Sequence, residues 1–238
     1  MKKSIFILLI FSLNLNILWA QKNDQDFVHD PEAKKVLDKL SQKMAKDTTA
    51  RIYFEYNYYN ATDSSEETFK GYLFVKGEKY KLIIPDVETF CDGQKVYTYN
   101  KKTNEINIVA YDPQSQDILT PNNILDIYKQ NFKYRLRGIA TFEAKVKKNN
   151  QITTEKKEAY VVDLYPENPK SVPYSIIRLW IDKNKNELIS IMYQGKNGIQ
   201  QVVNILEYKS NIFINNLIFK FDKNRYPKDI DIIDFTEK

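Results

Sequence analysis

The chain has 238 residues, of which 42% are hydrophobic and 28% are charged, and its formal net charge is +5 at pH 7. This length suits one all-β barrel or sandwich, and no internal repeat, linker or long charge block divides the chain. The positive net charge is too small to indicate nucleic acid as a partner. One histidine, His29, and one cysteine, Cys91, with no glycine-rich phosphate loop, favour neither catalysis nor a metal site.

Residues 1–20 have the pattern of a secretory signal peptide. Two lysines precede an apolar stretch from Ile5 to Leu13, and Ala20 ends a short cleavage motif. Cleavage there leaves residues 21–238, which we interpret as one domain in the periplasm with a formal charge of +3, because two lysines and no acid are lost. An uncleaved anchor is the alternative, but polar residues interrupt the apolar stretch where a membrane helix would stay apolar.

The first predicted element is a helix between Asp30 and Lys46. Its apolar residues recur at three- and four-residue spacings. They are Val36, Leu37, Leu40 and Met44. Asp30 can cap this helix, with Pro31 in the first turn. From Arg51 to Tyr59 the apolar period changes to two, which predicts a half-buried strand with Phe54 on its apolar face.

The next 40 residues predict a chain of antiparallel hairpins. Apolar residues alternate with polar ones, and turn residues such as Asp92-Gly93 separate the runs. The strands are expected at residues 69–76, 79–84, 87–91, 96–99 and 105–111.

The second half of the chain predicts one more helix and a further set of strands. Thr120 and Pro121 open the helix. It carries Ile124, Leu125, Tyr128 and Phe132. Strands follow at 133–147, 158–165, 176–181, 188–193 and 200–208, with 148–157 as a polar turn and short alternating strands at 219–221 and 229–234. Such a meander predicts a mainly β fold of about ten or eleven strands, a strongly curved sheet or barrel covered by helices.

Several short motifs occur in a fixed order along the chain. They are Gly71, Leu73, Val75 and Lys76 followed by Tyr80, Lys81 and Leu82; Asp92-Gly93 with Val96, Tyr97, Tyr99 and Asn100; Thr120-Pro121 with Ile124 and Leu125; the run Leu179-Trp180-Ile181-Asp182; and the terminal Phe219-Lys220-Phe221 with the acids after it. In this order the sequence resembles the LolA family of periplasmic lipoprotein carriers, from about Val36 to Phe235.

The resemblance implies an unclosed, strongly curved antiparallel β-barrel of about 11 strands, an α+β fold with a helical lid over an apolar cavity for acyl chains. The cavity residues it implies are Leu40, Met44, Phe54, Leu73, Leu82, Phe90, Ile124, Leu125, Tyr128 and Phe132. Each of these side chains could equally be plain core. The arginine that latches the lid in the family has no counterpart here, and Lys76 is its candidate substitute.

The function that the resemblance implies is that of a soluble, monomeric carrier without catalysis, cofactor or metal. It would receive acylated lipoproteins from an inner-membrane transporter that releases them and deliver them to an outer-membrane acceptor. An alternative remains open, a LolA-like module that binds or senses another lipid in envelope stress or export. The acceptor role is disfavoured, because the single cysteine, Cys91, does not lie at the start of the mature chain, where a lipid anchor needs it.

Overall fold

The computed structural model describes residues 29–113 and 131–236 of the chain. Within these ranges one α-helix accompanies twelve strands and three short 3-10 helices. The elements are α1 (Pro31–Met44), β1 (Thr49–Asn60), β2 (Ser65–Lys76), β3 (Lys79–Ile83), β4 (Val87–Cys91), β5 (Lys95–Asn100), β6 (Glu105–Ala110), β7 (Phe132–Lys148), β8 (Gln151–Pro166), η2 (Pro169–Ser171), β9 (Tyr174–Asp182), β10 (Leu188–Gly195), β11 (Ile199–Ser210), η3 (Asn216–Phe219), η4 (Lys223–Arg225) and β12 (Asp231–Asp234).

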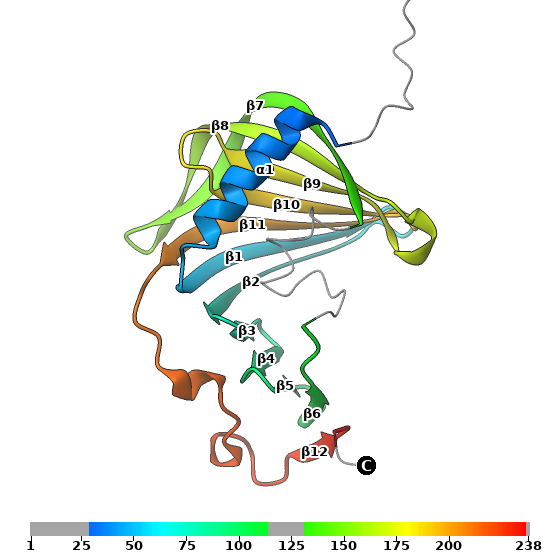
Figure 1. Cartoon of the computed structure of the whole chain (residues 1–238). Coiled ribbons are helices and arrows are strands. Elements are labelled where there is room, and N and C mark those ends of the chain that lie inside the picture. The colour runs from blue at the N-terminus through cyan, green and yellow to red at the C-terminus, as the bar shows by residue number, and fades with distance from the viewer. Residues whose placement is uncertain (1–28, 114–130, 237–238) are drawn as a thin grey trace, which may run out of the picture.

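All twelve strands belong to one sheet, in the order β12-β6-β5-β4-β3-β2-β1-β11-β10-β9-β8-β7. Its end strands β12 and β7 do not pair with each other, so the sheet curls without closing (Figure 1). Neighbours run antiparallel except β12, which pairs with β6 in parallel. The expected mainly β, unclosed architecture is therefore confirmed, with one parallel strand that the sequence did not predict.

Helix α1 begins as the sequence predicts. One carboxylate oxygen of Asp30 accepts hydrogen bonds from the backbone N–H of Glu32 at 2.9 Å and of Ala33 at 3.3 Å, and Pro31 occupies the first turn. The helix lies diagonally across β7 to β11 in Figure 1. Among the described residues, no helix is long and apolar enough to cross a membrane.

The apolar stripe of α1 packs into the main core of the molecule. The buried members of this core are Ala33, Val36, Leu37 and Leu40 of the helix with Phe132, Tyr134, Val162, Leu164, Tyr174, Ile177, Leu179, Ile181, Ile191 and Tyr193 of the sheet. Leu37 is fully buried. We call the face of the sheet that carries α1 the inner face and the opposite face the outer face.

The hairpin of β7 and β8 is longer than predicted. Residues 151–157, expected as part of a polar turn, form the first half of β8. The turn consists of Asn149 and Asn150 alone, whose φ angles of 48° and 64° suit a two-residue hairpin turn. This strand was not predicted because residues 151–157 are mostly polar, largely exposed and show no apolar alternation.

The segment after β11 crosses to the outer face before it ends in β12. The predicted strand at 219–221 is wrong, since Phe219 ends η3 and Phe221 is irregular. Their alternation reflects packing. Phe219 is fully buried, and the ring of Phe221 stacks 5.5 Å from that of Tyr97. Of the residues named for the predicted second helix, only Phe132 is described, and it begins β7.

Candidate functional site

The inner face continues from beneath α1 onto strands that the helix does not cover. Side chains at directly opposed positions of antiparallel strands share a face. Ile191 in the core beneath α1 is opposite Val203, Val203 is opposite Tyr56, and Tyr56 is opposite Phe69. The inner face therefore extends without a break from β10 across β11 and β1 to β2.

On β11, β1, β2 and β3 the inner face carries apolar and tyrosine side chains that are only half-buried. They are Ile52, Tyr56, Phe69, Leu73, Val75, Tyr80, Leu82, Ile84, Val203 and Ile205, which we call the open inner face. None of these residues belongs to the core beneath α1. Among the described residues, the helix thus covers the β7–β10 end of the inner face. The open inner face, at the other end, stays partly accessible.

Two pairs of opposed residues form the centre of the open inner face. Leu73 of β2 is opposite Leu82 of β3, and Val75 is opposite Tyr80. Phe54 forms the floor beside them and is 7% exposed. Its ring lies across Gly71, where an added Cβ atom would be 2.6 Å from the Phe54 Cζ atom. Glycine at this position therefore lets an aromatic ring lie flat against the strand.

Most charged side chains on the same strands point to the outer face, and Glu67, opposite Tyr58 on the inner face, is exposed near the start of β2. Glu55, next to Phe54 in β1, is 5% exposed and pairs with Lys145 at 2.6 Å. Lys81, next to Leu82 in β3, pairs with Glu88 at 3.1 Å. Because alternate residues of a strand point to opposite faces, the ionic groups are separated from the apolar surface. The open inner face therefore suits hydrocarbon and offers no acid-base pair for chemistry.

The structure places three of the predicted cavity residues in or against the packed core. Leu40 is 5% exposed and Phe132 is 6% exposed, and Met44 packs against the same cluster at the end of α1. Protein side chains already surround these residues. Phe54, Leu73 and Leu82, in contrast, lie together on the open inner face and at its floor.

Phe90 is not brought together with the other predicted cavity residues. It is opposite Lys81 and therefore on the outer face, whereas Leu82 is opposite Thr89 on the inner face. Its ring is 1% exposed and stacks 5.0 Å from that of Tyr97, beneath the C-terminal segment. The prediction failed because Phe90 is one position out of register with the inner residues of β4.

The predicted latch, Lys76, ties β2 to the segment that follows β11. Its Nζ donates a hydrogen bond to the carbonyl oxygen of Ile214 at 3.3 Å. Ile124, Leu125 and Tyr128 lie outside the described residues, so a contact between Lys76 and a lid stays a prediction.

Sequence reasoning also missed part of the open inner face. Ile52, Tyr56, Val75, Tyr80 and Ile84 were not named as cavity residues, although the period of two in their strands was recognised. The sequence did not reveal the pairing register of neighbouring strands. Once Leu73 is paired with Leu82, alternation alone places these five side chains on the same face.

No family model matches the sequence. No curated protein matches it either. Among solved structures, an uncharacterized conserved protein from Thermus thermophilus is similar, with 13% identity over 85% of this chain and 99% of that chain and a TM-score of 0.50. At this identity the likeness is one of fold.

Two further solved structures have names that describe a family. A putative outer membrane lipoprotein-sorting protein domain from Vibrio parahaemolyticus is 13% identical over 81% of this chain and 98% of that chain, with a TM-score of 0.43. A LolA superfamily protein from Nitrosomonas europaea is 13% identical over 80% and 98%, with a TM-score of 0.37. Because these scores are below 0.5, we take no site and no function from them. The fold itself is an unclosed, curled sheet with a helix on one face.

Proposed function

We propose that this protein is a periplasmic carrier that holds the acyl chains of lipoproteins against its open inner face and moves them from the inner to the outer membrane. The observation that carries this proposal is the open inner face itself. A continuous apolar surface of half-buried Leu, Ile, Val, Phe and Tyr side chains adjoins a closed core, and most charged groups of the same strands point away from it.

The physical basis is the transfer of hydrocarbon out of water. Each CH₂ group of an acyl chain gains about 0.8 kcal/mol when it is buried, so one long chain supplies a large driving force into an apolar site. A carrier must also release its cargo. A surface of half-exposed side chains around Leu73 and Leu82, without a fixed set of polar contacts, favours binding that tolerates different chains and permits transfer.

The remaining parts of the proposal concern segments and partners outside the described residues. Residues 1–20 would direct export and be removed, and residues 21–238 would form one lipid-binding domain. A helix around Ile124, Leu125 and Tyr128 would cover the open inner face as a lid, with Lys76 as a candidate latch. An inner-membrane transporter would load the monomer, and an outer-membrane acceptor would unload it. We propose no catalysis, cofactor or metal in this cycle.

The test is native mass spectrometry of the protein recovered from the periplasm without detergent. A bound mass that matches acylated lipoproteins, in a one-to-one complex, is the expected result. One copy of free phospholipid or another lipid alone would instead favour the alternative function, a lipid-binding or lipid-sensing module. Recovery of the protein without any lipid, together with no binding of long-chain fatty acid in vitro, would contradict both.

A further inference from the structure

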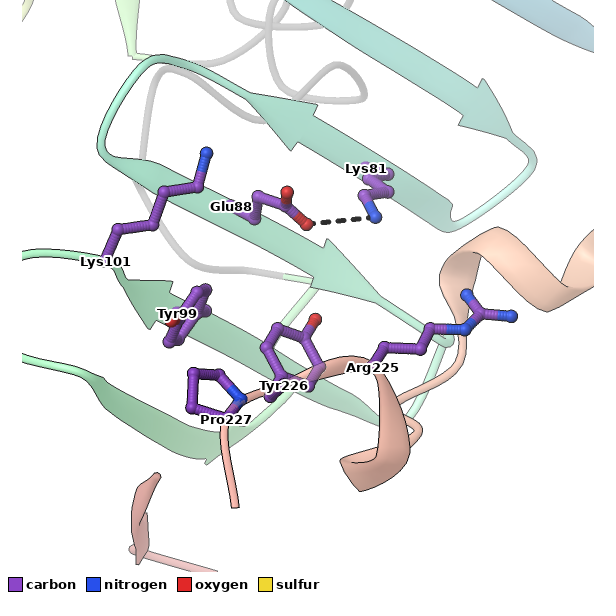
Figure 2. Close-up of a pocket in the computed structure, with 7 residues that line it drawn as sticks. All are labelled: Lys81, Glu88, Tyr99, Lys101, Arg225, Tyr226 and Pro227. Atoms are coloured by element: carbon purple, nitrogen blue, oxygen red, sulfur yellow. Dashed lines mark ion pairs between the residues drawn. The ribbon is translucent and has the colours of Figure 1, made fainter. Parts of the chain in front are cut away.

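A second candidate site lies on the outer face, on the side of the sheet away from the open inner face. A pocket of about 540 Å³ opens between β3–β5 and the C-terminal segment (Figure 2). Lys81, Glu88 and Tyr99 contribute the sheet side, and Tyr226 with its neighbours contributes the other. This volume is within the range of small-molecule sites.

The pocket has more positive than negative charge. Three cations, Lys81, Lys101 and Arg225, line it together with one carboxylate, Glu88. Lys81 and Glu88 pair at 3.1 Å and are largely buried, with side chains 16% and 23% exposed. This pair balances itself. Lys101 and Arg225 therefore give the pocket its excess positive charge.

The two remaining cations are held only weakly by the protein. The guanidinium of Arg225 lies 3.6 Å from the Asp222 carboxylate and 3.4 Å from the Leu217 carbonyl oxygen, and the Arg225 and Asp222 side chains are 49% and 44% exposed. Lys101 donates one hydrogen bond, to the carbonyl oxygen of Pro85 at 3.0 Å. Exposed ion pairs of this kind contribute little stability, so an incoming anion can replace them at small cost.

Tyr226 supplies a hydrogen-bond donor inside the pocket. Its hydroxyl bonds to no described residue, and Figure 2 shows it directed toward the Lys81–Glu88 pair. Burial raises the pKa of this phenol to about 12, with a smaller contribution from the Glu88 charge, so the hydroxyl keeps its proton at neutral pH. The ring is fixed by an edge contact with Tyr99, with centroids 4.8 Å apart. Figure 2 shows Lys101 and Arg225 on opposite sides of this hydroxyl, with the Arg225 guanidinium directed toward Leu217. Both side chains are long and weakly held, so either can turn toward an oxyanion at the fixed donor.

We propose that this pocket binds a small organic anion, a phosphate or carboxylate group attached to a ring-sized body. The Tyr226 hydroxyl would donate to the oxyanion, and the half-exposed Arg225 side chain would turn from Leu217 to bind it with its planar fork of donors. Lys101 would add positive charge on the other side of the pocket. The rings of Tyr99 and Tyr226 and the side chain of Pro227 would contact the body of the ligand. This site does not depend on the proposed carrier function, because it uses the other face of the sheet.

The experiment is a titration of the full mature chain with phenyl phosphate at low ionic strength, followed by amide NMR. Saturable shifts are expected at Lys81, Glu88, Arg225 and Tyr226. Arg225→Gln should weaken binding about tenfold or more and Tyr226→Phe about threefold or more, as the loss of a charge-assisted and of a neutral hydrogen bond predicts. Lys228→Gln is the matched control, since it removes the same charge from an exposed neighbour outside the pocket, and it should change the affinity less than twofold.

Two arms of the same titration distinguish the source of the anion. Dihexanoyl phosphatidic acid, below its micelle concentration, represents a lipid headgroup, and phenyl phosphate represents a soluble metabolite. Tighter binding of either one at residues 225–227 supports the site and assigns the source. Shifts that do not saturate, an equal loss in Lys228→Gln and Arg225→Gln, or shifts confined to the open inner face would each overturn the proposal. Lipid binding to the open inner face would survive that result, so the two proposals fail separately.

Discussion

Leu73 of β2 and Leu82 of β3 lie directly opposite each other on the inner face, and both side chains are half-buried. A leucine pair at the centre of a sheet is normally covered by a packed element. Here α1 packs on core residues of β7 to β10, and this core contains neither leucine. The same face of one sheet therefore combines a closed core, which stabilises the fold, with an apolar surface that is available to a ligand.

The first prediction is that Leu73→Glu or Leu82→Glu abolishes lipid binding and leaves the protein folded. A carboxylate at either position would be desolvated by a bound acyl chain, which strongly disfavours the complex. In the free protein it would remain partly hydrated. Binding of a fluorescent long-chain fatty acid, with circular dichroism to check the fold, measures both effects.

Phe74→Glu is the matched control for these variants. Phe74 is the neighbour of Leu73 in β2, is also half-buried, and points to the outer face between Arg51 and Lys81, where a carboxylate is tolerated. Lipid binding should persist in this variant. If Phe74→Glu and Leu73→Glu lose binding equally, the open inner face is not the lipid site.

The second prediction separates core from site among the residues that the sequence grouped together. Leu40→Ala should lower the free energy of unfolding by about 2–5 kcal/mol, because Leu40 is 5% exposed in the core beneath α1. Leu82→Ala should cost only about 1 kcal/mol, since its side chain is half-buried. Urea unfolding curves give both values. An equal loss of stability in the two variants would mean that Leu82 is ordinary core.

Local signals made much of the fold predictable. The hairpin at Gly93 was correctly expected, because its φ angle of 96° favours glycine and the Asp92-Gly93 pair is a recognisable turn signal. The parallel pairing of β12 with β6 was not predicted. It pairs Asp231 with Glu105, which are more than a hundred residues apart in the sequence, and no local sequence pattern predicts which distant strand is the partner.

The candidate site was predictable only in part, for a related reason. Alternation shows that a strand has two faces, but the pairing register decides which face is shared with the next strand. Leu82 and Phe90 look equally apolar in the sequence. They lie on opposite faces because Leu82 pairs with Thr89 and Phe90 with Lys81.

The third prediction concerns the pH dependence of stability through Asp30. Partial burial acts to raise the pKa of this carboxyl, but hydrogen bonds from the backbone N–H groups of Leu136, Ala33 and Glu32 outweigh it and hold the pKa below its usual value. A depressed carboxyl pKa stabilises the fold above the unfolded pKa of about 3.9, and this contribution is lost as the pH falls through the folded pKa.

Asp30→Ala should therefore reduce the free energy of unfolding by about 0.5–2 kcal/mol at neutral pH, as the loss of a helix cap predicts. The difference from wild type should narrow as the pH falls below about 4, the unfolded pKa, and towards the lower pKa at which the folded carboxylate is protonated. Asp229→Ala, which removes an exposed carboxylate outside any helix, should show little difference at either pH. A constant gap for Asp30→Ala across this range would contradict the assigned role of the ionised cap.

The fourth prediction tests the floor of the open inner face. An added methyl group in Gly71→Ala would lie 2.6 Å from the Phe54 ring and 2.7 Å from the carbonyl oxygen of Ile83. We expect a loss of about 1–3 kcal/mol in the free energy of unfolding, as for other overpacked sites. Adding Phe54→Leu should recover only part of this lost stability, because the backbone carbonyl of Ile83 cannot move away from the added methyl group as a side chain can. Full recovery of stability in the double variant would show that contact with the Phe54 ring is the sole reason for glycine at position 71.

The fifth prediction concerns a buried ion pair on the outer face of β8 and β9. Asp163 is 1% exposed and accepts two hydrogen bonds from Arg178, at 2.6 and 2.9 Å. The hydrogen bonds to Asp163 raise the pKa of the Arg178 guanidinium. Among the described residues, Arg178→Met would leave the buried carboxylate with Arg137 at 3.8 Å and the Tyr165 hydroxyl at 3.2 Å as its partners. The expected cost is about 3–5 kcal/mol in urea unfolding at neutral pH.

The double variant Arg178→Met with Asp163→Leu should be more stable than Arg178→Met alone, since it removes the uncompensated charge as well. Lys183→Met is the surface control. It breaks the exposed pair of Lys183 with Glu158 at 3.0 Å and should change the free energy of unfolding by about 0.5 kcal/mol or less. If the double variant is less stable than Arg178→Met, the carboxylate of Asp163 supports the fold by itself, through Arg137 and Tyr165, and the pair is not the unit that stabilises this end of the sheet.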